Sequence, residues 1–426
     1  MDRYVRRCDL LRLKALMTTM LVAIQILLLA IVGFLVIYLF MLSVLASFAR
    51  TSKHPIATRL RRFAAVIPAH NEEFTIAPTI QTLLQADYPR ERFDVVVIAD
   101  NCTDRTAEVG KENGAIVLER QNNELRGKGY ALRWCFDQLL SQKNHYDAFI
   151  VVDADSIASV NFLAVMNSYL EQGATVIQAS DLVKPQPGAW SSEMTRLGFT
   201  LYNYVRPLGR RVIACSAGLR GNGMCFDASV LSAHPWQAYS RAEDLEFGLH
   251  LLLQGIPVAF APEASVLATM PQNPQLAESQ RARWEGGRLP VIRKYSLPLI
   301  RNAVVRGSFR SLDAFIDLVT PPLITLMGMV TVILLATLAL YAFGVASMLP
   351  FAYLWPGIFL LGFLHMFVGL YAAHADPHQY KALFHLPRYT LWKAALLLKL
   401  VREDQTKEWI RTTREPAAPR EHPTKV

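Results

Sequence analysis

Two aspartates near the middle of the chain, Asp153 and Asp155, directly follow a short apolar run. The run, residues 149–152, reads Phe-Ile-Val-Val, which is typical of a strand buried on both faces of a parallel sheet. Ligands of open α/β sheets bind at the carboxyl ends of the strands. Two carboxylates there suit Mg²⁺ or Mn²⁺, which proteins hold through oxygen ligands together with substrate phosphates. The alternative is an aspartate-rich turn that merely closes the strand.

The position of these carboxylates depends on where the strand ends. If it continues to Asp155, both side chains point the same way, because residues i and i+2 of a strand share a face. If it breaks at Asp153, both aspartates lie on a loop just beyond the sheet.

Strands and helices alternate around this pair. Apolar strands are expected at residues 63–67, 93–99, 116–118, 149–152, 175–179 and 258–260, and helices at 75–84, 103–113, 129–140, 162–170 and 242–254. This alternation predicts βαβ units, a mostly parallel sheet and right-handed crossovers. Residues 184–211, rich in aromatic and basic side chains, show no regular pattern.

Long apolar runs flank this α/β region. Residues 17–49 contain no charged side chain and are long enough to span a bilayer, and residues 318–343 and 349–373 give two further spans. Residues 297–316 and 380–401 mix apolar with basic side chains, which favours helices lying in the membrane interface. We therefore expect four segments: a membrane helix (1–50), an α/β domain (51–296), an interfacial helix with two membrane helices (297–375), and an interfacial helix with a polar tail (376–426).

The distribution of charge and the cysteine content indicate the environment of the protein. The net charge of +9 lies largely beside the apolar runs, where basic residues attract anionic lipid headgroups. The sequence contains no basic patch interleaved with aromatic residues, so nothing in it indicates a nucleic-acid partner. The five cysteines form no C-x-x-C pair, as expected for reduced thiols in a reducing compartment.

Five motifs follow one another along the α/β region in a fixed order. They are Ile67–Glu73 (Ile-Pro-Ala-His-Asn-Glu-Glu) together with Asp100-Asn101, Gly127-Lys128-Gly129, Asp153-Ala154-Asp155, Glu243-Asp244, and Gln280-Arg281-Ala282-Arg283-Trp284. In this order they resemble the membrane-bound family 2 glycosyltransferases, which include cellulose, hyaluronan and poly-N-acetylglucosamine synthases and ceramide glucosyltransferases. The resemblance implies a GT-A fold, a Rossmann-like α/β domain that takes a nucleotide-activated sugar, here a UDP-sugar, and inverts the anomeric configuration to make a β-linkage.

The resemblance also implies roles for individual residues. The nucleotide sugar would be bound by Pro68, Ala69, His70, Asn71, Glu72, Asp100, Asn101, Lys128, Asp153, Asp155 and Arg283. Asp155, supported by Asp153, would hold Mg²⁺ or Mn²⁺, which neutralises the charge of the departing nucleoside diphosphate. Lys128 would add a compact positive charge for the phosphates.

Asp244 would be the general base, because direct inversion needs a carboxylate that takes the proton from the attacking hydroxyl. Like charge on Glu243 and Glu246 is expected to raise one of these pKa values. The acceptor would be bound by Gly221, Asn222, Gly223, Glu243, Gln280 and Trp284, with the indole face available for stacking.

Each assignment has a structural alternative. The loop after residue 67 could serve only to end a strand and cap a helix, Asp100 could be a turn residue, and Lys128 a solvated charge. The acidic pair could merely favour a helix N-terminus, and the Gln280–Trp284 motif could anchor anionic lipid.

Two acceptors remain open: a growing polysaccharide or oligosaccharide, which the family resemblance favours, and a membrane lipid. Three spans are few for a polymer channel. An export or accessory subunit is a possible further partner. A catalytically silent membrane protein that only binds a nucleotide or a partner is a third alternative. We expect an integral membrane protein of the bacterial inner or plasma membrane, with the catalytic domain in the cytosol.

Overall fold

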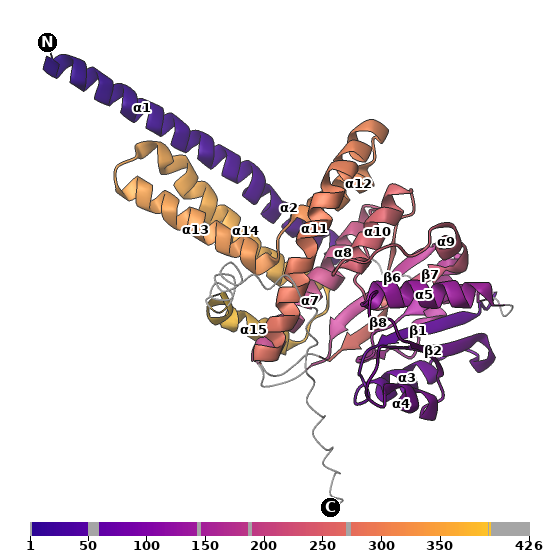
Figure 1. Ribbon diagram of the computed structural model, residues 1–426. Coiled ribbons are helices and arrows are strands. Elements are labelled where there is room, and N and C mark those ends of the chain that lie inside the picture. The colour runs from indigo at the N-terminus through magenta and orange to yellow at the C-terminus, as the bar shows by residue number, and fades with distance from the viewer. Residues whose placement is uncertain are drawn as a thin grey trace, which may run out of the picture.

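The computed structural model of the protein describes residues 2–49, 59–142, 146–185, 190–269, 274–390 and 392. Within helix α11 it describes the backbone of residues 274–285, and their side chains lie outside the description. The described chain forms an α/β domain joined to a group of long apolar helices (Figure 1).

An eight-stranded mixed sheet lies at the centre of the α/β domain, in the order β3-β2-β1-β4-β7-β6-β8-β5. The strands are β1 (Phe63–Ala69), β2 (Phe93–Asp100), β3 (Ile116–Arg120), β4 (Ala148–Val151), β5 (Ser156–Ala158), β6 (Val176–Val183), β7 (Met224–Asp227) and β8 (Ala259–Ala268). β1, β2, β3 and β4 run parallel, as do β6 and β8. β7 lies antiparallel between β4 and β6, and β5 is antiparallel to β8. The predicted mostly parallel sheet is thus confirmed.

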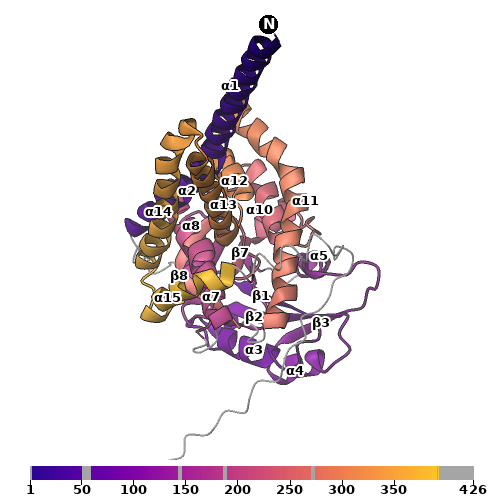
Figure 2. The ribbon, with the colours of Figure 1, turned by 90° about the vertical axis from the view of Figure 1, so that its left-hand side faces the viewer.

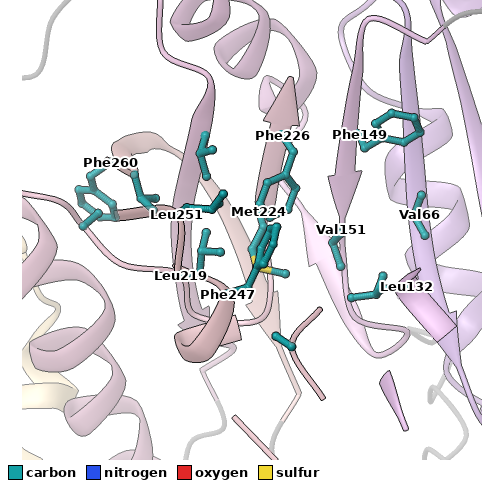
Figure 3. Close-up of a cluster of buried hydrophobic side chains, with 14 of the residues drawn as sticks. Val66, Leu132, Phe149, Val151, Leu219, Met224, Phe226, Phe247, Leu251 and Phe260 are labelled. Carbon is teal, nitrogen blue, oxygen red and sulfur yellow. The ribbon is translucent and has the colours of Figure 1, made fainter. Parts of the chain in front are cut away.

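Helices cover both faces of this sheet. The helices are α3 (Ile76–Leu84), α4 (Thr106–Glu112), α5 (Lys128–Ser141), α6 (Phe162–Glu171), α9 (Ala228–Ala233) and α10 (Glu243–Leu253). α3 and α6 share one apolar core with the sheet, and α5 and α10 share the other. Figure 3 shows the second core, in which Leu132 of α5 and Phe247 of α10 lie against the strand residues Phe149, Val151 and Phe226. Because both faces are buried, the strands read as continuous apolar runs.

Several elements differ from the sequence prediction. β1 continues through Pro68 to Ala69, where it was expected to stop before the proline. β4 ends at Val151, so Asp153 and Asp155 lie on the following loop. The antiparallel strands β5 and β7 were not predicted, because each is only three or four residues long and pairs with residues distant in sequence.

The stretch 184–211 was expected to be irregular, which is wrong for its larger part. α7 (Trp190–Phe199), the π-helical turn η3 (Thr200–Val205) and α8 (Arg206–Val212) form one continuous helical run. The π-turn shifts the side-chain register within the run, which hides the helical period in the sequence. Such turns are frequent at functional sites.

Three helical segments are long and apolar enough to cross a membrane, as expected: residues 11–47, 323–342 and 346–372. The first belongs to α1 (Asp2–Leu28), η1 (Leu29–Gly33) and α2 (Phe34–Ser47), and the others to α13 (Leu323–Ala342) and α14 (Leu349–Ala372). They group together at the end of the molecule away from α3 and α4 (Figure 2). Two hydrogen bonds join all three, from Gln25 Nε2 to Thr337 Oγ1 and from Trp355 Nε1 to Gln25 Oε1.

Two further helices, α11 and α12, pack against α10 of the α/β domain (Figure 2). α11 (Pro274–Arg306) and α12 (Phe309–Val319) are separated at Gly307, whose φ of 60° ends the first helix. The single helix predicted over residues 297–316 is therefore divided in two. α12 is amphipathic, with Asp313 and Asp317 buried and Phe309 and Leu312 exposed. Of the segment predicted at 380–401, residue 391 and residues 393–401 lie outside the described part; the remainder includes the end of α15 (Pro377–Ala382).

The α/β domain packs directly against the apolar helices. A Cβ added to Gly209 of α8 would lie 2.3 Å from the Leu42 carbonyl oxygen of α2. A Cβ at Gly369 of α14 would lie 2.6 Å from Leu201 in η3. Glycine at both positions therefore allows the closest approach between the two parts of the molecule.

Candidate functional site

The predicted nucleotide-binding loops meet at the carboxyl ends of β1 and β2. Pro68 and Ala69 are the last residues of β1, and the ring of the following His70 places Nδ1 2.7 Å from the carbonyl oxygen of Asp100. Since a carbonyl only accepts, Nδ1 carries the proton in this contact. Asn71 and Asn101 both have positive φ values, which asparagine tolerates better than most residues.

Their side chains hold the loops together. Asn71 Oδ1 accepts a hydrogen bond from the Thr103 amide, and Asn101 Oδ1 accepts one from the Asn122 amide, each over 2.7 Å. Glu72 donates its amide to Thr106 Oγ1. Within the described residues, the Asn71 and Asn101 side chains and the Glu72 amide therefore fix the shape of the loops after β1 and β2.

Asp100, at the end of β2, is buried and paired. Its Oδ1 accepts hydrogen bonds from Arg120 Nη1 over 2.5 Å and from Asn101 Nδ2 over 3.0 Å. Arg120 is itself buried and also donates to the Leu125 carbonyl. The pair thus presents one carboxylate oxygen, Oδ2, beside a guanidinium.

Lys128 joins two predicted binding regions. It is the first residue of α5, and its Nζ donates to Asp153 Oδ1 over 2.5 Å and to the Gly221 carbonyl over 2.6 Å. The glycines beside it have separate reasons: Gly127 has a φ of 116°, and a Cβ on Gly129 would lie 2.2 Å from the Ala238 carbonyl. Nearby carboxylates raise the pKa of Lys128 to about 12, although burial opposes the charge.

A buried polar network supports the loop that carries the two aspartates. Asn222 Oδ1 accepts from the Asp153 amide, and Asn222 Nδ2 donates to Ser156 Oγ and Asp181 Oδ1. Asp181 also accepts from Asn203 Nδ2 of η3. Burial, followed by the charge of Asp153, raises the pKa of Asp181 well above its usual range. The Asn222 amide, predicted to contact the acceptor, is used within the protein.

Glu243 and Asp244 are the first two residues of α10. Burial and the neighbouring Asp244 raise the pKa of Glu243 from 4.5 to about 7. Burial also raises the pKa of Asp244, while the Leu245 amide and the charges of Lys128 and Arg220 oppose the shift. A Cβ on Gly221, which has a φ of 85°, would lie 3.1 Å from Asp244 Oδ2. The Asp244 carboxylate therefore faces the bare Cα of Gly221.

Glu246 does not add like charge in the way the sequence suggested. Its Oε1 accepts from Lys294 Nζ over 2.6 Å, and its Oε2 accepts from the Ser240 amide. Although burial opposes it, these hydrogen bonds lower the pKa of Glu246. Of the two expected neighbours, Glu243 is the one whose pKa is raised by the charge of Asp244.

The donor set at Asp153 and Asp155 fits a divalent cation. The loop presents two carboxylates at the edge of the sheet, and the Asp153 side chain is 39% exposed. In the described part of the chain, no group of three or more His, Cys, Asp or Glu residues could hold a metal. An ion here would need substrate oxygens to complete its shell, as Mg²⁺ commonly does.

The other predicted acceptor and phosphate residues divide into two groups. Gly223 follows Asn222 with a φ of 69°, and a Cβ there would lie 2.9 Å from Val266 Cγ2, so glycine is required by packing. The side chains of Gln280, Arg281, Arg283 and Trp284 lie on α11 outside the described residues.

Three charged residues at the site were missed. Arg120 pairs with Asp100, Asp181 anchors Asn222, and Arg220 directly precedes Gly221. Only Arg220 had a signal in the sequence, because it adjoins the Gly221–Gly223 motif. The other two lie two residues beyond the strands predicted at 116–118 and 175–179 and belong to no motif.

Known proteins resemble the α/β part of the chain. The model of "Glycosyltransferase like family 2" matches residues 61–287, a little over half of the chain. A probable glycosyltransferase of Bacillus subtilis, YdaM, is 24% identical over 249 residues, covering 55% of this chain and 57% of that protein. A beta-monoglucosyldiacylglycerol synthase of Nostoc sp. is 28% identical over 237 residues, covering 52% of this chain and 48% of its own. The matches thus span about half the length of these relatives.

Among solved structures, the mannosyltransferase PcManGT of Pyrobaculum calidifontis, in complex with GDP-Man and Mn²⁺, has a TM-score of 0.54. Its identity is 14%, and the match covers 84% of this chain and 99% of that one. This likeness concerns the fold, and the expected GT-A-like α/β domain with three long apolar helices is confirmed.

Proposed function

The chain belongs to the Glycosyltransferase like family 2, and on that premise we propose that it transfers a sugar from UDP to a lipid at the membrane. The observation that carries this proposal is the bridge made by Lys128 Nζ between Asp153 and the Gly221 carbonyl. It joins the loop suited to the donor diphosphate to the loop that faces Asp244. Donor and acceptor would therefore meet at this ammonium.

Asp100 supports uracil as the base of the donor. Its Oδ1 is occupied by Arg120 and Asn101, which leaves Oδ2 to accept one N–H. The imide of uracil presents a single N–H between two carbonyls, and the neighbouring guanidinium could donate to one of them. Guanine presents two adjacent donors and would need both carboxylate oxygens.

Asp153 and Asp155 would hold the divalent ion. When bound, such an ion supplies positive charge opposite the leaving diphosphate. Lys128 adds a second fixed charge, held in place by its contact with the Gly221 carbonyl. Preorganised charges of this kind usually contribute the largest share of catalysis.

Asp244 would act as the general base. Recessed at the N-terminus of α10, it faces Gly221, where a side chain would obstruct an approaching hydroxyl. Its carboxylate would take the proton of that hydroxyl as the hydroxyl attacks the anomeric carbon from the face opposite the diphosphate, which inverts the configuration. Glu243 would remain protonated up to about neutral pH and would bind the acceptor.

A lipid acceptor is favoured over the polysaccharide that the motifs first suggested. The relatives named above include a diacylglycerol glucoside synthase, and three candidate spans are few for a polymer channel. The proposal includes a membrane-integral protein with residues 51–296 as a cytosolic catalytic domain, where nucleotide sugars are available. It keeps the predicted bounds of the other three segments, with the helix expected at 297–316 divided at Gly307.

The test uses the purified full chain in detergent with Mn²⁺, radiolabelled UDP-sugars and GDP-mannose, and a membrane lipid extract. Label from a UDP-sugar should enter the organic phase, and Asp244→Asn should lower kcat by about 10²- to 10⁴-fold at unchanged nucleotide affinity. Asp137→Asn, an exposed aspartate paired with Arg133, is the matched control. Label in a long water-soluble polymer would refute the lipid acceptor, and nucleotide binding without any transfer would refute the enzyme.

A further inference from the structure

Four arginines and two aspartates gather where the α/β domain meets α12; we call them the arginine cluster. Its members are Arg206, Arg210, Arg220, Arg288, Asp313 and Asp317. Arg210 is fully paired, because it donates to Asp313 through Nε and to Asp317 through Nη1. Asp313 also accepts from Tyr38 of α2.

One carboxylate is then left for three guanidiniums. Asp317 lies 3.5 Å from Arg206 and 3.7 Å from Arg220, and Arg288 donates to its carbonyl oxygen instead of its carboxylate. Although burial opposes ionisation, the surrounding arginines hold the pKa of Asp317 well below its usual range. Four guanidiniums against two carboxylates leave two positive charges without a partner within the cluster.

The donors of these arginines are not all used. Arg206 is 2% exposed, and within the described residues its Nη1 makes no hydrogen bond, since its ion-pair partner Asp317 Oδ1 lies 3.5 Å away. Nε of Arg220 likewise makes no hydrogen bond within the described residues. Burial lowers the pKa of Arg206 by more than the nearby Asp317 can offset. A buried charged donor without a partner costs free energy, and where one occurs, an ion or water commonly supplies the missing acceptor.

Three of the four guanidiniums lie around the ring of Tyr202 in η3. The guanidinium carbons of Arg220, Arg206 and Arg288 lie 4.3, 4.8 and 5.9 Å from its centroid. Burial alone would raise the pKa of Tyr202, but the charges of Arg288 and Arg220 lower it. Tyr202 and Arg288 are half-buried and form the more exposed side of the cluster.

The cluster adjoins both the candidate base and an apolar surface. Arg220 directly precedes Gly221, which faces Asp244, and its charge acts on that carboxylate. On the other side, α12 exposes Phe309 and Leu312, and the end of α11 exposes Val304 and Val305. An amphipathic helix of this kind lies at the level of lipid headgroups.

We propose that the arginine cluster binds the phosphate of a membrane lipid, and that a hydroxyl group of this lipid is the acceptor. Phosphate carries up to two charges and three acceptor oxygens, which matches the surplus charge and the free donors. The role of this lipid as the acceptor rests on the proposed function, whereas the phosphate-binding site does not depend on that function.

The test measures binding to the full chain in detergent, without any nucleotide sugar, by native mass spectrometry. Three ligands separate the chemistry: dioctanoyl phosphatidic acid, dioctanoylglycerol and glycerol 3-phosphate. Phosphatidic acid should bind at least tenfold more tightly than either of the others. Arg206→Gln should remove about tenfold of that affinity.

Arg306→Gln is the matched control, since Arg306 is an exposed arginine at the end of α11. Its effect should stay within twofold, and UDP binding should be unchanged in both variants. Equal binding of phosphatidic acid and dioctanoylglycerol, or equal losses in the two variants, would overturn the phosphate site. Glycerol 3-phosphate binding as tightly as phosphatidic acid would overturn the lipid source.

The comparison of the three ligands on the unaltered chain decides the matter even if Arg206→Gln does not fold. It also separates this inference from the proposed function. Selective phosphatidic acid binding by a protein that transfers no sugar would leave the site standing and refute the reaction. Sugar transfer to a lipid without phosphate, with no selectivity in binding, would do the reverse.

Discussion

The ammonium of Lys128 donates a hydrogen bond to the carboxylate of Asp153 over 2.5 Å. The contact links the N-terminus of α5 to the loop after β4, two elements that the sequence separates by 25 residues. The same ammonium also donates to the Gly221 carbonyl, so it connects the loop of Asp153 to the loop of Gly221.

Replacing Lys128 with methionine should weaken UDP binding by about tenfold or more, because a charged hydrogen-bond donor to the diphosphate is lost. Isothermal calorimetry with UDP and Mn²⁺ measures it. Lys111→Met, at an exposed lysine of α4 paired with Glu119 of β3, is the control. Unchanged affinity in Lys128→Met would show that this ammonium serves only the fold.

Removing the divalent ion should weaken UDP binding without unfolding the protein. Two carboxylates alone hold such an ion weakly, so we expect UDP and Mn²⁺ to raise each other's affinity. Calorimetry with and without EDTA measures this coupling. Asp155→Asn should abolish it, whereas Asp87→Asn, an exposed residue after α3, should leave it intact. Equal UDP affinity in EDTA and in Mn²⁺ would argue against a metal site.

Glu243 should make stability fall as pH rises. Its folded pKa is about 7 and its ordinary value is 4.5, so the folded protein holds a proton that the unfolded chain releases between these values. The associated stability is present below pH 4.5 and is lost by about pH 7. Glu243→Gln should therefore raise the metal-free Tm by a few degrees at pH 8 and leave it unchanged at pH 4.

Thermal unfolding in detergent at the two pH values checks this expectation. Glu108→Gln, at an exposed glutamate on α4, should show no such pH dependence. A Glu243→Gln variant that is less stable at pH 8 would mean that Glu243 is ionised there at no cost.

Gly209→Ala should destabilise the contact between α8 and α2. The added methyl group would lie 2.3 Å from the Leu42 carbonyl, so one of the two backbones must move, at a cost of about 1–3 kcal/mol. Gly198→Ala is the matched control, because a Cβ there meets nothing within 4 Å and alanine favours the helix. A lower Tm in the first variant and an equal or higher Tm in the second is the expected result.

The sequence predicted the parts of this molecule that rest on local patterns. Apolar runs marked the buried strands β1, β2 and β4, and uncharged runs marked the three long apolar helices. Motif order brought Asp153, Lys128 and Asp244 together before the structure did. For the strands and the apolar helices, the residues that decide the outcome are neighbours in the chain, whereas the distant site residues were grouped by the order of the family motifs.

The parts it missed depend on partners distant in sequence. β7 pairs with β4 more than 70 residues away, and Arg210 meets Asp313 across 103 residues. The register shift in η3 disguised a helix as an irregular stretch. Pro68 lies within β1, where a proline normally marks the end of a strand.

The close contacts at Gly209 and Gly369 fix the position of the α/β domain relative to the apolar helices. Helix α8, which carries Arg206, approaches the backbone of α2 at Gly209, and Leu201 of η3, the turn that carries Tyr202, packs against Gly369 of α14. Under the proposed function, the reacting groups would therefore lie at a fixed depth relative to the three apolar helices. A lipid whose reactive group lies deeper or farther out in the bilayer would then be a poorer acceptor than one whose reactive group lies at that depth.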